Sequence, residues 1–109
     1  MAAASDTLVR IEFYVPESHV EEVKQAMFAA GAGRVGDYDS CAWQTLGQGQ
    51  YRPLQGSQPH LGVTGQKETV AEYKVEMVCK QAIKEQVLAA MKATHPYEEV
   101  AYGVIRIES

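Results

Sequence analysis

The sequence has little cysteine and no excess of positive charge, and each shortage excludes a class of protein. The two cysteines, Cys41 and Cys79, are too few for a disulfide framework, and their spacing fits no zinc-binding pattern. Ten lysines and arginines stand against 14 acidic residues, a net charge of −4, which argues against a general binder of nucleic acids or anionic membranes. We therefore expect reduced thiols that pack as small apolar residues, and neither a nucleic-acid nor a membrane partner.

Long hydrophobic runs are also missing from the chain. No apolar stretch approaches the roughly 20 residues that span a bilayer, and the first seven residues lack the basic and apolar regions of a signal peptide. We expect a cytoplasmic protein with a flexible tail over residues 1–7 and a single domain over residues 8–107, since 109 residues leave no room for a second core.

Two strand-and-helix patterns flank the middle of the chain. Apolar residues at every second position predict half-buried strands over residues 8–15 and 70–79, and helical spacing predicts helices over residues 20–30 and 83–91. A last strand is expected from Tyr102 to Ile107. With a short strand in the middle third, this order predicts an α+β fold: a ferredoxin-like βαββαβ sandwich, with two helices on one face of a four-stranded antiparallel sheet.

The middle third is rich in glycine, which predicts turns and loops around a short strand at residues 41–46. Residues 31–36 spell the G-x-G-x-x-G pattern of dinucleotide sites, but the expected helix precedes it and the strand follows. This is the reverse of what phosphate binding needs, so we interpret the segment as a helix end and turn. Residues 47–53 fit either an anion-binding turn with Arg52 facing the anion, or a hairpin tip with Arg52 in solvent.

Residues 95–99 concentrate a histidine, a tyrosine and two glutamates directly after the second predicted helix. Pro96 ends that helix and stiffens the turn. One interpretation is a preorganised site. The other is structural, with His95 capping the helix and Tyr97 packing against the body of the domain.

In the predicted fold this turn converges on Glu72 at the start of the third strand, and the glycine-rich segment is long enough to fold over both. We expect a ligand site formed by Tyr38, Asp39, Arg52, Glu72, His95, Tyr97 and Glu98. Its imidazole and two carboxylates, from His95, Glu98 and Glu72, suit a divalent metal ion such as Zn²⁺. They suit equally a polar ligand whose amine or hydroxyl is held by Glu98 and whose acid meets Arg52.

Several segments, taken in order, resemble a known family. They are Gly31-Ala32-Gly33, Tyr38-Asp39 with Cys41, Gly47-Gln48-Gly49 with Tyr51-Arg52-Pro53, then Gly56, Pro59, Gly62, Glu68 and Glu72, and finally His95-Pro96-Tyr97-Glu98-Glu99. Over residues 8–107 the chain resembles the PII/CutA-like middle domain of YqfO-type proteins of the Nif-three-like family. The resemblance implies a fold similar to PII and CutA, which assemble as trimers and bind ligands at subunit clefts. It also implies that the family's two-metal site lies in flanking lobes. We expect the domain to stand alone here, so no metal-hydrolase residue carries over.

Two functional hypotheses follow from the residues and the resemblance. The first is a non-enzymatic, PII/CutA-like homotrimeric module that binds a small ligand or metal ion. The second is a small metal-dependent enzyme or metal-handling protein that uses His95, Glu98 and Glu72. No pair of nucleophile and base is visible, which favours the first hypothesis, and no catalytic residue or cofactor beyond a divalent metal ion is indicated.

Overall fold

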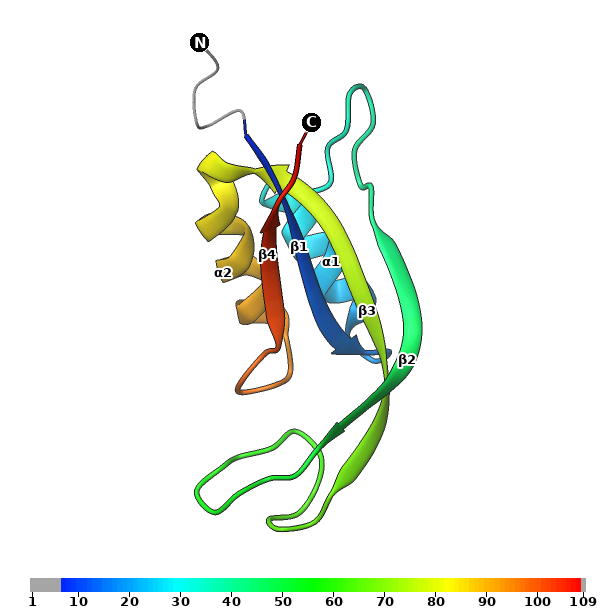
Figure 1. The fold of residues 1–109 in the computed structure, drawn as a ribbon, viewed down its shortest axis with the longest axis vertical. Coiled ribbons are helices and arrows are strands. Elements are labelled where there is room, and N and C mark those ends of the chain that lie inside the picture. Colours follow the sequence, from blue (N-terminus) through cyan, green and yellow to red (C-terminus); the bar gives the residue numbers. More distant parts are fainter. Residues whose placement is uncertain (1–6, 109) are drawn as a thin grey trace.

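The computed structural model describes residues 7–108. The elements follow the order β1 (Leu8–Pro16), α1 (Val20–Ala29), β2 (Trp43–Tyr51), β3 (Glu68–Lys80), α2 (Lys84–Thr94) and β4 (Tyr102–Arg106), with a short 3₁₀ turn at Gln81–Ile83 before α2 (Figure 1). Residues 1–6 of the tail expected over residues 1–7 lie outside the described residues. The backbone carbonyl of Thr7 accepts a hydrogen bond of 2.7 Å from the Gln81 N–H.

The four strands form one sheet in the order β2-β3-β1-β4, and every neighbouring pair is antiparallel. Phe13 on the central strand β1 lies opposite Val75 of β3 on one side and Tyr102 of β4 on the other. Both helices cover the same face of this sheet (Figure 1). The predicted ferredoxin-like fold is therefore confirmed.

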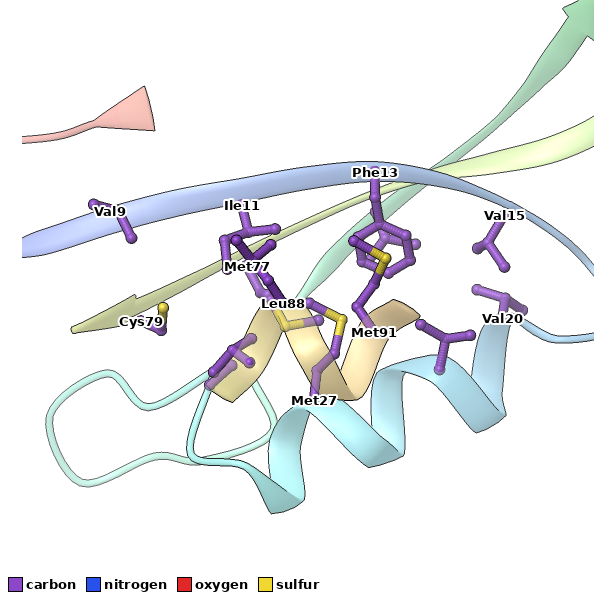
Figure 2. Packing of buried hydrophobic residues seen from close by; sticks show 14 residues of the cluster. Val9, Ile11, Phe13, Val15, Val20, Met27, Met77, Cys79, Leu88 and Met91 are labelled. Carbon is purple, nitrogen blue, oxygen red and sulfur yellow. The ribbon is translucent and has the colours of Figure 1, made fainter. Parts of the chain in front are cut away.

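The core lies between the sheet and the two helices (Figure 2). The alternation predicted for the first strand is confirmed over residues 8–15, where the odd-numbered side chains are fully buried and the even-numbered ones are only partly buried. Met27 of α1 and Met91 of α2 fill the space beneath Phe13 and Ile11, and burying side chains of this size contributes about 1.5–3 kcal/mol each. Cys79 is buried as expected, whereas Cys41 is only half-buried, with its Sγ 3.6 Å from the Asp39 carbonyl oxygen.

The helix ends follow from residues with special backbone preferences. Gly31 adopts φ +110° directly after the C-cap of α1, a conformation that side chains with a Cβ rarely adopt. The G-x-G-x-x-G segment is thus a helix end and turn, as interpreted. Helix α2 ends at Thr94 because His95, the residue before Pro96, is extended with φ −76° and ψ 139°. Within residues 7–108, neither helix is long and apolar enough to cross a membrane.

A two-stranded arm extends beyond the sheet (Figure 1). Strand β2 pairs with β3 along its whole length, from Trp43 opposite Glu76 to Tyr51 opposite Glu68. Strand β1 pairs with β3 only as far as Glu72. The end of β2 and the start of β3 therefore continue alone and carry the loop 52–67. Both interpretations of residues 47–53 as a turn are corrected, because residues 47–51 lie within strand β2 and the chain reverses only after Arg52.

Candidate functional site

A pocket of about 440 Å³ lies where the arm, the loop 52–67 and the turn after α2 meet the end of β1. Four parts of the chain that are distant in sequence contribute to it. The lining residues are Tyr14, Gln50, Tyr51, Pro53, Ser57, Pro59, His60, Glu72, Tyr97, Glu98, Glu99 and Ala101. The pocket thus combines aromatic rings, prolines and carboxylates.

Tyr97 connects the turn after α2 to β3. Its hydroxyl donates a hydrogen bond of 3.0 Å to Oε2 of Glu72. Its ring packs against Tyr51, with centroids 6.5 Å apart, and against His60, with centroids 6.2 Å apart. Burial and, next, the negative charge of Glu72 raise the pKa of Tyr97 above its ordinary value, so the hydroxyl remains a protonated donor at neutral pH.

Glu72 is paired with Gly47 in the register of β2 and β3, but its side chain lies across Gly49, two residues further along β2. A Cβ added at Gly49 would overlap Oε1 of Glu72, whereas a Cβ added at Gly47 would meet no atom within 4 Å. The carboxylate of Glu72 therefore lies directly against the backbone of β2 at Gly49. This close approach, and not the freedom to turn, explains why this strand position suits a glycine.

Hydrogen bonds tie the loop 52–67 to the turn after α2 and to strand β2, and a further one closes the loop on itself. The backbone N–H of Gln58 donates to Oε1 of Glu98 at 2.7 Å. The hydroxyl of Tyr51 donates to the Leu61 carbonyl at 2.5 Å, and the Gly65 N–H donates to the Pro53 carbonyl at 2.7 Å. The loop therefore forms a tethered wall of the pocket.

His95 is a structural residue beside the pocket. It is 7% exposed, and its ring lies edge-on to Phe13. Because a carbonyl only accepts hydrogen bonds, we assign the ring proton to Nε2, which donates to Tyr14 O at 2.7 Å, while Nδ1 accepts the Tyr97 N–H at 3.1 Å. Burial lowers the pKa of His95, which favours this neutral form. Both ring nitrogens are engaged with the backbone, so the ring holds the turn in place.

The structure brings together three of the predicted site residues, Glu72, Tyr97 and Glu98, at the pocket. Arg52 is exposed and does not line the pocket. Tyr38 and Asp39 lie in the exposed loop after α1, towards the opposite end of the molecule (Figure 1).

The proposed metal ligands do not converge into one site. Within residues 7–108, no three histidine, cysteine, aspartate or glutamate side chains are placed to hold a metal ion. The set of His95, Glu98 and Glu72 is therefore not assembled around a common point: His95 is engaged with the backbone, and Glu98 and Glu72 bind different groups.

Sequence reasoning missed the residues that complete the pocket, chiefly Tyr14, Tyr51 and His60. His60 has no other candidate ligand residue beside it in the sequence, yet its ring packs against His19, with centroids 5.7 Å apart, and against Tyr97. These contacts depend on how the arm and its loop fold back, which no local spacing reveals. Tyr51 was named only for the family resemblance, although its place beside Arg52 and Pro53 was the nearest available signal.

Comparison with known proteins shows which proteins this chain is similar to. No family model matches the sequence. The GTP cyclohydrolase 1 type 2 homolog of Bacillus subtilis is 39% identical over 104 residues, which cover 95% of this chain and 28% of that protein. The homolog of Mycobacterium bovis is 45% identical over 94 residues, which cover 86% of this chain and 25% of that protein. A crystal structure of a Bacillus cereus protein related to NIF3 matches with a TM-score of 0.82 and 35% identity over 95% of this chain and 26% of that one. The chain is a homologue of one segment of the YqfO-type, Nif-three-like proteins.

The Nif-three-like relatives are much longer than this chain, which spans only about a quarter of their length. Structures of CutA, a periplasmic divalent cation tolerance protein from Archaeoglobus fulgidus, and of CutA1 from Oryza sativa match with TM-scores of 0.67 and 0.69. The match to the Archaeoglobus protein covers 94% of this chain, and the match to the Oryza protein covers 98%; each covers 85% of the CutA chain. The sequences are only 15% and 13% identical, so this likeness shows the fold alone. The family resemblance and the CutA-like fold expected from the sequence are both confirmed.

Proposed function

We propose that this protein is a non-enzymatic binding or regulatory module that holds a small ligand in the pocket between the arm and the turn after α2. The observation that carries this proposal is a pocket with walls already tied together, through the bonds Tyr97–Glu72 and Gln58–Glu98. A site of this kind loses little conformational entropy when a ligand binds. Its volume and its mixture of apolar and carboxylate lining are typical of small-molecule sites.

The module acts as a cyclic homotrimer in this proposal. In the described chain, β2 and β4 each leave one backbone edge of the sheet unpaired, and such edges favour association unless they are covered. Large apolar side chains lie exposed on these two strands, including Trp43 at 68% and Ile105 at 39%. The resemblance to PII and CutA adds the expectation of trimers with ligand sites at subunit clefts, by analogy of fold.

The alternative, a metal-dependent enzyme built on His95, has less support. A metal ligand must present a free lone pair, and both ring nitrogens of His95 already bind the backbone. The hydroxyl of Ser57 in the pocket donates to the Leu54 carbonyl and is not activated by a neighbouring base. We therefore expect no phosphoester hydrolysis.

Native mass spectrometry of gently purified protein tests this proposal. We expect a trimer that carries a small-molecule adduct in the wild type. Ala101→Trp places a large side chain at the pocket lining and should remove the adduct, while Ala89→Trp on the exposed surface of α2 is the matched control and should retain it. An adduct that survives Ala101→Trp, or wild-type protein without any adduct, contradicts the proposal.

A further inference from the structure

We infer that the pocket selects an organic cation, an ammonium or guanidinium group on an apolar body. This inference rests on the proposed function and names the ligand class of the same site. Three features of the pocket favour such a cation: the charge of its lining, the acceptor capacity of its carboxylates and the aromatic rings in its wall.

The charge of the lining is negative and uncompensated. Glu72, Glu98 and Glu99 line the pocket, and of the residues that the structure describes, no lysine or arginine does so. The four ion pairs found between residues 7 and 108 all lie elsewhere: Arg10–Glu76, Lys24–Glu21, Lys74–Glu12 and Lys84–Glu85. A bound cation would therefore supply the missing counter-charge, while a bound anion would face three carboxylates with no compensating group.

The carboxylates keep an acceptor free for a ligand. Glu72 uses Oε2 for the Tyr97 hydroxyl, and Glu98 uses Oε1 for the Gln58 N–H. In the described part of the chain, no donor reaches the second oxygen of either group. Each carboxylate is thus held in place by one hydrogen bond. Oε2 of Glu98 remains open to a charge-assisted bond with an N–H donor, whereas Oε1 of Glu72 lies against Gly49 of β2, so Glu72 contributes chiefly its negative charge to the pocket.

An aromatic wall lies alongside these oxygens. The rings of Tyr51 and His60 both pack against Tyr97 at centroid distances of 6.5 Å and 6.2 Å, inclined by 51° and 47°. The tyrosine faces attract a cation placed within about 6 Å of the ring centroid. Because the Tyr97 hydroxyl donates its hydrogen bond to Glu72, its ring is richer in electrons than that of a free phenol. Pro53 and Pro59 add apolar surface for the body of the ligand.

A bare metal ion does not fit this arrangement. It would need several ligands around one point, and no such group of three exists within residues 7–108. A guanidinium or amidinium group instead distributes its charge over several atoms, and an ammonium group directs three N–H donors to different acceptors; both suit separated carboxylates and inclined rings. Charge, a free acceptor and ring geometry therefore favour the same ligand class.

Three planar probes of similar shape test the charge preference: benzamidine as the cation, benzamide as the neutral control and benzoate as the anion. We expect benzamidine to shift the backbone amide signals of Gln58, Tyr97 and Glu98 in an NMR titration. Benzamide should bind about tenfold more weakly, a difference of about 1.4 kcal/mol, and benzoate should leave these signals unchanged. Equal binding of benzamide, or a preference for benzoate, overturns the inference.

Charge-neutral variants then locate the effect. Glu72→Gln and Glu98→Gln each retain an oxygen that accepts the Tyr97 hydroxyl or the Gln58 N–H, so they remove the charge and keep the tether. Each should weaken benzamidine binding about tenfold. Glu22→Gln makes the same change of charge on the exposed surface of α1 and should have no effect.

An equal loss in Glu22→Gln and Glu98→Gln, or no benzamidine shift at the pocket amides, also overturns the inference. These outcomes are separate from a failure of the proposed function, which is judged by the adduct and its loss in Ala101→Trp. An adduct that responds to Ala101→Trp, in a protein that does not prefer benzamidine, would identify a ligand site with a different chemistry.

Discussion

The hydroxyl of Tyr97 donates a hydrogen bond of 3.0 Å to Oε2 of Glu72, and this bond joins the turn after α2 to strand β3. Glu72 lies on β3 where the pairing with β1 ends, at the base of the arm. Tyr97 also contacts His60 on the loop 52–67. A single phenol therefore connects the body of the domain, the arm and the loop, and the pocket depends on its position.

Tyr97→Phe should make the protein less stable at neutral pH and less sensitive to alkaline pH. Loss of the hydrogen bond to Glu72 costs about 1 kcal/mol of unfolding free energy. Burial and the charge of Glu72 raise the pKa of Tyr97 above its ordinary value of 10.0. Its contribution is therefore fully present below that value and is lost as the pH rises past it.

Urea unfolding at neutral pH and above pH 10.0 measures both effects of Tyr97→Phe. The exposed Tyr102, which lies under Lys92, provides the control Tyr102→Phe. The same loss of stability with rising pH in wild type and Tyr97→Phe would show that this phenol is not the group responsible.

His95→Gln should reduce the loss of stability at acidic pH. Burial is the main cause that lowers the pKa of His95 from its ordinary value of 6.5. The charges of His19 and His60 lower this pKa further, whereas the hydrogen bond to the Tyr14 carbonyl raises it. Below about pH 6.5 the unfolded chain binds a proton that the folded chain resists, so stability falls as the pH falls through this window. Urea midpoints measured on either side of this pH should decline less in His95→Gln than in the wild type, and an equal decline in both would show that His95 is not the group responsible.

His95→Ala should destabilise the protein by about 2 kcal/mol at neutral pH, because it leaves the Tyr14 carbonyl and the Tyr97 N–H without their partner. Chemical denaturation measures the loss. A change of less than about 0.5 kcal/mol would contradict the structural role that the two hydrogen bonds of His95 indicate.

Gly49→Ala and Gly47→Ala form a matched pair on β2. The new Cβ at residue 49 overlaps Oε1 of Glu72, whereas the one at residue 47 meets no atom within 4 Å. Because Glu72 is a flexible side chain, we expect both variants to keep their melting temperatures within a few degrees of each other. Only Gly49→Ala should displace the carboxylate and weaken benzamidine binding several-fold. Equal binding by the two variants would mean that Glu72 is not positioned by Gly49.

The trimer should appear in light scattering coupled to size exclusion. We expect a mass about three times that of the 12.0 kDa chain, independent of concentration over the range measured. The physical reason is the pair of unpaired sheet edges on β2 and β4 in the described chain, together with exposed Trp43 and Ile105. A concentration-independent mass of 12.0 kDa would contradict the proposed assembly.

The sequence by itself determined the fold class, because burial leaves a local periodic trace. Alternating residues from Val9 to Val15 are fully buried as predicted, and the chain order of strands and helices permits few topologies. Gly31 and Pro96 ended the helices as expected, since their backbone preferences are local too. The family resemblance depended on similar short segments and was confirmed for the same reason.

Only the tertiary structure decided which residues form the pocket. Glu72 and Tyr97 were predicted to meet, but His60 and Tyr51 reach Tyr97 through the arm and its loop, whose path is set by contacts between distant residues. From its sequence neighbours alone, His95 fitted both a ligand site and a helix cap. The carbonyl of Tyr14, on strand β1, engages its ring and gives it a structural role. Spacing along the chain indicates which groups are available, whereas hydrogen-bond partners across the fold determine which of them stay free to bind.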